Sequence, residues 1–120
     1  MKLVPADHVA AMSSVVPQPG SPIGPTWLEG PFTSDRLDVG LVSLQPGGET
    51  LPHVHLGGQV MVVTAGRGFV ATDDDRIEVG PGDVVICAPG ESHVHGAVVD
   101  SPFAHLTITT LGYTFPGQAD

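Results

Sequence analysis

Short runs in which hydrophobic and polar residues alternate dominate the chain from residue 37 onward. Alternation with a period of two is typical of strands that have one buried and one exposed face. Turn sequences such as AGRG, TDDD and GPGD separate neighbouring runs and supply the glycine, aspartate and proline that tight turns require. The pattern predicts seven short strands, at residues 37–45, 59–64, 68–72, 76–79, 83–88, 93–99 and 103–111. Strands of this length and spacing predict an all-β protein, built as an antiparallel barrel or sandwich.

The N-terminal part of the chain differs in composition from the rest. Residues 13–31 are rich in proline, glycine and serine, and we interpret them as an extended arm rather than as part of the core. A length of 120 residues fits one domain. We therefore expect an N-terminal arm at residues 1–31, a barrel at residues 32–115 and a C-terminal tail at residues 116–120.

The net charge of the chain argues against a nucleic acid as its partner. Four basic residues against 13 acidic residues give a net charge of −9, which would repel a nucleic acid. The single cysteine, Cys87, cannot form a disulfide within the chain, and its apolar neighbours predict a buried, unreactive thiol. The N-terminal residues contain no uninterrupted apolar segment for secretion or for membrane spanning. These features predict a soluble cytoplasmic protein whose partners include neither nucleic acid nor membrane.

Histidines are concentrated in two short motifs of the same form. In the first motif, PHVHLGGQ, one residue separates His53 from His55, so on a strand their side chains point to the same face. Gln59 has the same parity, although a bulge at Gly57 and Gly58 would change it. A single His-x-His pair on a strand is more often a surface or core pair than a metal site.

A second pair and a further histidine make a metal site the better interpretation. His93 and His95 repeat the one-residue spacing on another predicted strand, and His105 lies on a third. Imidazole ligands with an amide or carboxylate oxygen suit manganese, iron, zinc, copper and nickel, so the ligand types alone do not select one metal. The other interpretation of His105 is a structural residue that is hydrogen-bonded across the barrel.

The sequence around the first pair resembles the first motif of the cupin superfamily. The motif positions within GGETLPHVHLGGQVMVVTAGRG are Gly47, His53, His55, Gln59 and Gly66. Every spacing fits, and the one change is that Gln59 occupies the acid position. The second motif, which contains His93, is similar but looser: Pro89 is displaced by one residue, and Ala97 stands where asparagine is common.

The resemblance implies a small cupin β-barrel, which is a double-stranded β-helix of the jelly-roll type. It also implies that the barrel holds one divalent metal ion, ligated by His53, His55, Gln59 and His93. Within the superfamily the chain is most similar to small bacterial cupins that act as manganese-dependent hydroxynitrile lyases. Mn²⁺ is therefore the expected ion, and Fe²⁺, Zn²⁺ or Ni²⁺ would also fit. Because cupins commonly pair through barrel faces and N-terminal strands, the extended arm is consistent with a homodimer.

The same resemblance implies an activity. With glutamine in place of the acid, a set of neutral ligands leaves the charge of the ion uncompensated, which makes it a stronger Lewis acid. In a hydroxynitrile lyase, the hydroxyl of a cyanohydrin would bind the ion, His105 would take its proton, and His95 would bind or protonate cyanide. Three alternatives stay open: an iron-dependent cupin dioxygenase, a non-catalytic cupin that binds a metal or small ligand, and an isomerase or decarboxylase of an oxygenated metabolite.

Overall fold

The structure is a computed structural model of residues 1–120. It describes residues 38–109 continuously, together with Leu3, Pro5, Asp7 and three short strands near the two ends of the chain. These short strands are β1 (Ser14–Val16), β2 (Pro19–Ser21) and β12 (Tyr113–Thr114), which are described as backbone only. Within this part of the chain, no helix is long and apolar enough to cross a membrane.

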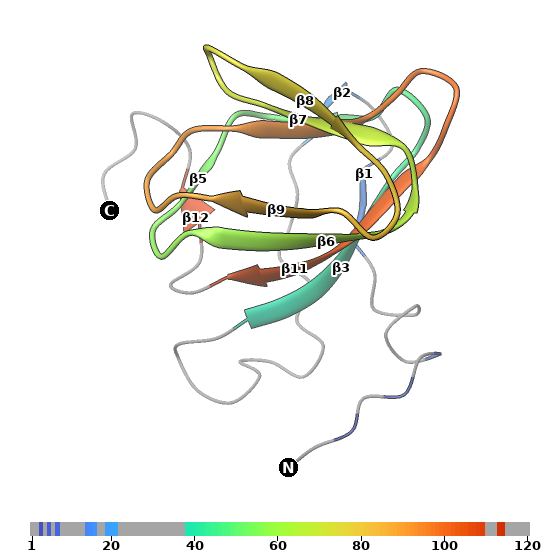
Figure 1. The fold of residues 1–120 in the computed structure, drawn as a ribbon, viewed down its shortest axis with the longest axis horizontal. Coiled ribbons are helices and arrows are strands. Elements are labelled where there is room, and N and C mark those ends of the chain that lie inside the picture. Colours follow the sequence, from blue (N-terminus) through green and yellow to red (C-terminus); the bar gives the residue numbers. More distant parts are fainter. Residues whose placement is uncertain are drawn as a thin grey trace.

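Two five-stranded sheets form the body of the molecule (Figure 1). The first has the strand order β1-β3-β11-β6-β9 and the second β2-β4-β10-β7-β8, while β12 and β5 form a separate two-stranded ribbon. The remaining strands are β3 (Asp38–Leu44), β4 (Glu49–Thr50), β5 (Val54–His55), β6 (Gln59–Gly66), β7 (Gly68–Ala71), β8 (Arg76–Val79), β9 (Val84–Cys87), β10 (Val94–Ala97) and β11 (Phe103–Thr109). The predicted all-β architecture is confirmed, and each of the seven predicted strands corresponds to one of the longer strands.

Most neighbouring strands are antiparallel, as predicted, and the exceptions lie near the N-terminus. The strand β1 pairs with β3 and β2 pairs with β4, both in parallel and both within the same chain. The predicted boundaries between arm, barrel and tail, at 31/32 and 115/116, lie outside the described residues. The division into residues 1–31, 32–115 and 116–120 therefore stays a prediction.

The inner faces of the strands change character along the barrel. The buried apolar core consists of Val42, Leu44, Met61, Val63, Val70, Val79, Val85, Cys87, Ala97 and Phe103. On β11 the inward-facing residues begin with Phe103, continue with His105 and Thr107, and end at Thr109, so the strand runs from an apolar end to a polar end. The inner face of β6 runs the opposite way, from Gln59 to Met61 and Val63, because the two strands are antiparallel. Burial of the apolar end stabilises the fold, while the polar side chains gather toward the other end.

A glycine and a register shift shape the apolar end of β6. Gly66 has a φ of 73°, a backbone conformation that side chains rarely adopt. A Cβ at Gly66 would also overlap the carbonyl oxygen of Pro102, which explains why this position requires glycine. The pairing of β6 with β11 shifts register between Ala104 and His105, so His105 lies opposite Val63. The shift keeps His105 and Val63 on the inner face together.

Candidate metal centre

The two histidine motifs are joined by a backbone bridge. His53 donates its backbone N–H to the carbonyl of His93 over 3.0 Å, and the reciprocal bond from His93 to His53 is also 3.0 Å. This antiparallel pair brings together residues that are far apart in the sequence. The ring centroid of His53 consequently lies 4.5 Å from that of His93, 5.1 Å from that of His55 and 5.1 Å from that of His95.

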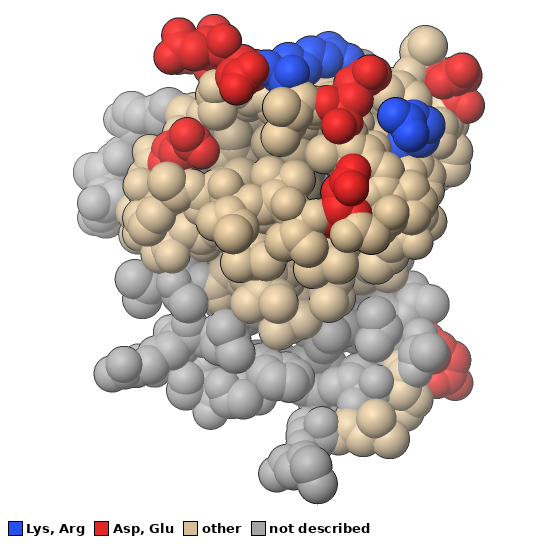
Figure 2. All heavy atoms as spheres, viewed as in Figure 1, with Lys and Arg blue, Asp and Glu red and all other residues tan. Residues whose placement is uncertain are grey.

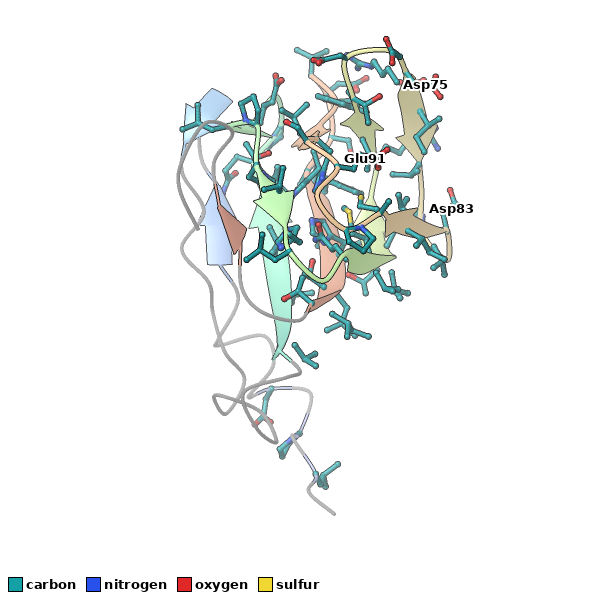
Figure 3. All side chains as sticks on the ribbon, turned by 90° about the vertical axis from the view of Figure 1, so that its left-hand side faces the viewer. Asp75, Asp83 and Glu91 are labelled. Carbon is teal, nitrogen blue, oxygen red and sulfur yellow. The ribbon has the colours of Figure 1, made fainter. Side chains whose placement is uncertain are left out.

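Three of these side chains form a group that could hold a metal ion. One ring nitrogen from each of His53, His55 and His93 lies within 4.8 Å of the others. The three side chains are 5%, 7% and 2% exposed, so the group is shielded from solvent. Among the described side chains, no carboxylate or thiolate belongs to this group. The acidic residues Asp75 and Asp83 instead lie at the outer edge of the molecule (Figure 3).

The same local arrangement sets the tautomer of two of these histidines. The Nδ1–H of His53 donates to the backbone carbonyl of Leu51 over 2.8 Å, and the Nδ1–H of His93 donates to that of Glu91 over 3.1 Å. A carbonyl oxygen can only accept, so Nδ1 carries the proton in both rings and Nε2 carries the lone pair. A hydrogen bond of this kind commonly orients a histidine whose other nitrogen binds a metal.

Burial keeps these two rings uncharged at neutral pH. Burial lowers the pKa of His53 to about 4, against a smaller raising effect of the hydrogen bond to Leu51. Burial also lowers the pKa of His93. Imidazole must be neutral to ligate a metal, so both groups are in the required state at pH 7.

Gln59 meets this cluster with its carbonyl oxygen. Its Oε1 lies 3.0 Å from Nε2 of His93, while its Nε2 donates to Oγ1 of Thr107 over 3.2 Å. Since the proton of neutral His93 resides on Nδ1, the 3.0 Å contact joins two atoms that carry lone pairs and no proton. Two such atoms repel each other unless they share a cation. The donor set and its orientation therefore fit a divalent metal ion held by imidazole nitrogens and an amide oxygen.

A second pair of histidines lies beside the cluster and outside the three-residue group. His95 and His105 are 1% and 0% exposed, and Nε2 of His105 lies 3.2 Å from Nδ1 of His95 in a hydrogen bond. The other nitrogen of His105, Nδ1, is 2.8 Å from Oγ1 of Thr107. Burial, followed by the nearby histidines, lowers the pKa of His105 to about 3 and lowers that of His95 well below its ordinary value. Both rings are neutral at pH 7.

The structure brings together every histidine that the sequence singled out for the site, and Gln59 with them. It also adds two hydroxyl groups that were not predicted as site residues. Thr107 bonds to both Gln59 and His105, and the buried Thr50 accepts the backbone N–H of His95 over 3.1 Å. Thr107 could have been found from its spacing, because a residue two positions after His105 on a strand points to the same face. No sequence pattern pointed to Thr50.

Cys87 has no part in the candidate centre. Its side chain is 3% exposed and belongs to the apolar core. Burial, followed by the charge of Glu91, raises the pKa of the thiol to about 11. The thiolate, which is the reactive form, is therefore scarce at neutral pH. The predicted burial of Cys87 is confirmed, and its raised pKa agrees with the predicted low reactivity.

An all-β barrel with a buried cluster of imidazole donors defines the class of this protein. The cupin domain family matches residues 40–109, which is more than half of the chain, and the chain belongs to that family. It is 43% identical over 68 residues to the (R)-mandelonitrile lyase of Granulicella tundricola. That match covers 56% of this chain and 52% of the lyase, so the chain spans about half the length of this relative.

Solved structures support the same fold. A cupin-like protein from Thermotoga maritima has a TM-score of 0.68 at 30% sequence identity, covering 77% of this chain and 73% of that protein. The polyketide cyclase RemF from Streptomyces resistomycificus has a TM-score of 0.73 at 21% identity, covering 100% of this chain and 88% of the cyclase. At 21% identity, the similarity to RemF concerns the fold alone. The predicted jelly-roll cupin barrel is confirmed.

Proposed function

We propose that this protein is a metal-dependent lyase that cleaves or forms cyanohydrins, in the manner of a hydroxynitrile lyase. The observation that carries the proposal is the set of neutral, buried donors with a hydrogen-bonded histidine pair beside it. The 43% identity to an (R)-mandelonitrile lyase supports the same reaction class. A small oxygenated molecule is the substrate in this proposal, and Mn²⁺ is the proposed ion, with Fe²⁺, Zn²⁺ or Ni²⁺ as other possibilities.

His53, His55, Gln59 and His93 would hold the ion. Two backbone carbonyls fix the Nε2 lone pairs of His53 and His93, and the Gln59 amide presents its oxygen beside His93. Three imidazoles and an amide are neutral ligands, so this set would remove none of the ion's double charge. When bound, such an ion supplies Lewis acidity that stabilises negative charge on a substrate oxygen by several kcal/mol.

His95 and His105 would move the proton. In cleavage, the carbon–carbon bond to the nitrile breaks and its electron pair leaves with cyanide, while the hydroxyl carbon becomes a carbonyl. The hydroxyl proton passes to Nε2 of His95 as the Nδ1 proton of His95 passes to Nε2 of His105, across their 3.2 Å hydrogen bond. The reverse transfer returns a proton through His95 to cyanide. The products are a carbonyl compound and hydrogen cyanide, so atoms and charge balance, with His105 as the base that stores the proton.

The test is turnover of mandelonitrile by protein loaded with Mn²⁺, with product release followed under air and under nitrogen. We expect benzaldehyde and cyanide in equal amounts and at equal rates in both atmospheres. Oxygen uptake that matches substrate loss would favour the iron-dependent dioxygenase instead. Stoichiometric metal without turnover of cyanohydrins would favour a binding cupin or an isomerase, and would contradict the lyase.

We also propose that the chain forms a homodimer through the outer face of the first sheet. Two cross-strand rows on this face are entirely apolar, namely Val39, Ile108, Val60 and Ile86, and Leu41, Leu106, Val62 and Val84. Ile86 and Val84 are 76% and 57% exposed. The strands β6, β9 and β11 cross the front of Figure 1, and Figure 2 shows this region to be largely free of charged side chains. A second copy suits the face because an uncharged surface lets two chains of net charge −9 approach each other.

Ile86→Lys should convert the dimer to a monomer, because a lysine in the centre of a symmetric apolar contact must lose its hydration in both copies. Light scattering coupled to size-exclusion chromatography measures the mass. Ile77→Lys is the matched control, since Ile77 is 46% exposed but lies on β8 of the other sheet. A monomeric wild type, or a dimer that survives Ile86→Lys, would contradict this interface. Location in the cytoplasm stays a prediction from the sequence.

A further inference from the structure

We propose that Thr107 is a positioning residue that fixes, through one hydroxyl oxygen, both the metal-facing atom of Gln59 and the tautomer of His105. The inference rests on the ligand and base roles proposed above. Thr107 lies on the inner face of β11, two residues after His105, and is paired with Met61 of β6. From there its Oγ1 reaches Nε2 of Gln59 at 3.2 Å and Nδ1 of His105 at 2.8 Å. This oxygen therefore contacts both a proposed ligand and the proposed base.

The first consequence concerns the amide of Gln59. An amide nitrogen has no lone pair to offer a cation, so Gln59 can act as a ligand only with Oε1 toward His93. The side chain of Gln59 is 4% exposed, and its orientation is set by what its other end meets. A hydroxyl oxygen that accepts from Nε2 holds Oε1 at 3.0 Å from the lone pair of His93. Without that acceptor the amide would turn over and donate to His93, which would place its nitrogen where the ion should bind.

The second consequence concerns His105. A hydroxyl oxygen has two lone pairs, and one of them is taken by Gln59. The contact between Oγ1 and Nδ1 of His105 is 2.8 Å. In this proposal the second lone pair accepts the Nδ1–H of His105, which keeps the proton of the neutral ring on Nδ1 and leaves the lone pair on Nε2. That lone pair faces Nδ1 of His95 and is the acceptor that the proposed proton transfer requires. If Thr107 instead donated to His105, Nε2 would carry the proton and the ring could accept none from His95.

The two roles are therefore linked through the same oxygen. After proton transfer, His105 carries a proton on each nitrogen and donates to Thr107 and His95 at once, which stabilises the charged ring. A side chain of the same shape without the hydroxyl would lose both effects while keeping a similar volume at the position opposite Met61. Valine is such a side chain, and serine keeps the hydroxyl but lacks the methyl group. The pair of substitutions separates hydrogen bonding from packing.

The experiment compares the wild type, Thr107→Val and Thr107→Ser in two measurements that do not depend on turnover. The first is Zn²⁺ affinity by competition with a chelator. The second is the tautomer of His105, read from its imidazole ¹⁵N shifts in the metal-free protein at pH 7. We expect Thr107→Val to weaken Zn²⁺ binding by about 10-fold or more, the size of effect seen when a partner of a metal ligand is removed. We also expect the His105 proton to redistribute from Nδ1 toward Nε2, and both properties to return in Thr107→Ser.

The outcomes separate this inference from the proposed function. If the wild type binds Zn²⁺ and Thr107→Val binds it equally well, or if the tautomer of His105 is unchanged, the inference about Thr107 is wrong and the metal site stands. A change in only one of the two properties would also overturn the joint role. If the wild type binds no metal, the proposed function fails instead. In metal-loaded protein, kcat for mandelonitrile should fall in Thr107→Val with little change in KM, since Thr107 acts on the base and a ligand rather than on substrate.

Discussion

His53→Ala should abolish both metal binding and catalysis, reducing metal content from one ion per chain to trace levels and lyase activity to the uncatalysed rate. His53 is the centre of the donor cluster, with ring contacts to His55, His93 and His95. Its Nε2 lone pair is oriented by the hydrogen bond to Leu51, so alanine removes both a donor and the contact that aims it. Elemental analysis after loading with Mn²⁺ and removal of unbound ion measures the loss.

A matched variant separates loss of the metal from loss of the fold. His105→Gln alters a histidine that is also buried but lies outside the three-residue group, and it should retain one ion per chain. Thermal unfolding of both variants shows whether the barrel is intact. A wild type without stoichiometric metal would count against the whole site, and a His53→Ala variant that keeps its full metal content would remove His53 from it.

Alternation of hydrophobic and polar residues, together with the turn sequences between the runs, was enough to predict the longer strands, and alternating burial is clearest in β6 and β9. The strand β6 shows this, with Gln59, Met61 and Val63 buried and Val60 and Val62 only half-buried. His53, His55 and Gln59 are all buried, but parity accounts only for the two histidines. A turn at Leu56 and Gly57, closed by the hydrogen bond from the Gly58 N–H to the His55 carbonyl, separates β5 from β6, so the position of Gln59 follows from the turn and not from alternation. Local periodicity therefore predicts which way side chains point within a strand.

Alternation could not predict the shortest strands, nor the backbone pairing that brings the two histidine motifs together. β4 and β5 have two residues each, too few for any period to be visible. The bridge between His53 and His93 depends on pairing between residues far apart in the chain, and such register is fixed by the whole barrel. The carbonyls of Leu51 and Glu91, which set the ring tautomers, are backbone groups and leave no trace in residue identity.

Hydrogen bonds between side chains inside the barrel also could not be predicted from the sequence. Thr107 has the same strand parity as His105, but threonine is common on strands, and parity alone does not indicate a chemical role. Its role emerges only when Gln59, on another strand, is seen to reach the same oxygen. Sequence reasoning therefore found the residues that carry lone pairs, while the structure was needed to determine which of those lone pairs face one another.

His105→Gln should keep the metal and lose most of the turnover, with kcat for mandelonitrile falling by about 10²- to 10⁴-fold, the usual contribution of a general base. The ring of His105 is neutral at pH 7 and is hydrogen-bonded to His95 and Thr107, so it is placed to receive a proton through His95. Because burial lowers its pKa to about 3, the charged ring is a short-lived state that returns its proton to cyanide. Glutamine can occupy the space and bond to Thr107, but its amide is not a base at neutral pH. Steady-state kinetics on protein of verified metal content measure the effect, and His105→Ala should give the same loss.

The competing explanation is a structural histidine that only fills the barrel, because His105 is 0% exposed. A structural role predicts a lower melting temperature with kcat per folded, metal-loaded chain unchanged, whereas a base predicts a lower kcat in protein that remains folded at the assay temperature. Unchanged turnover in His105→Gln would remove the base from the proposal and leave His95 to accept the proton alone. His95→Gln provides the complement: if the two histidines form one relay, the double variant should be scarcely slower than either single variant.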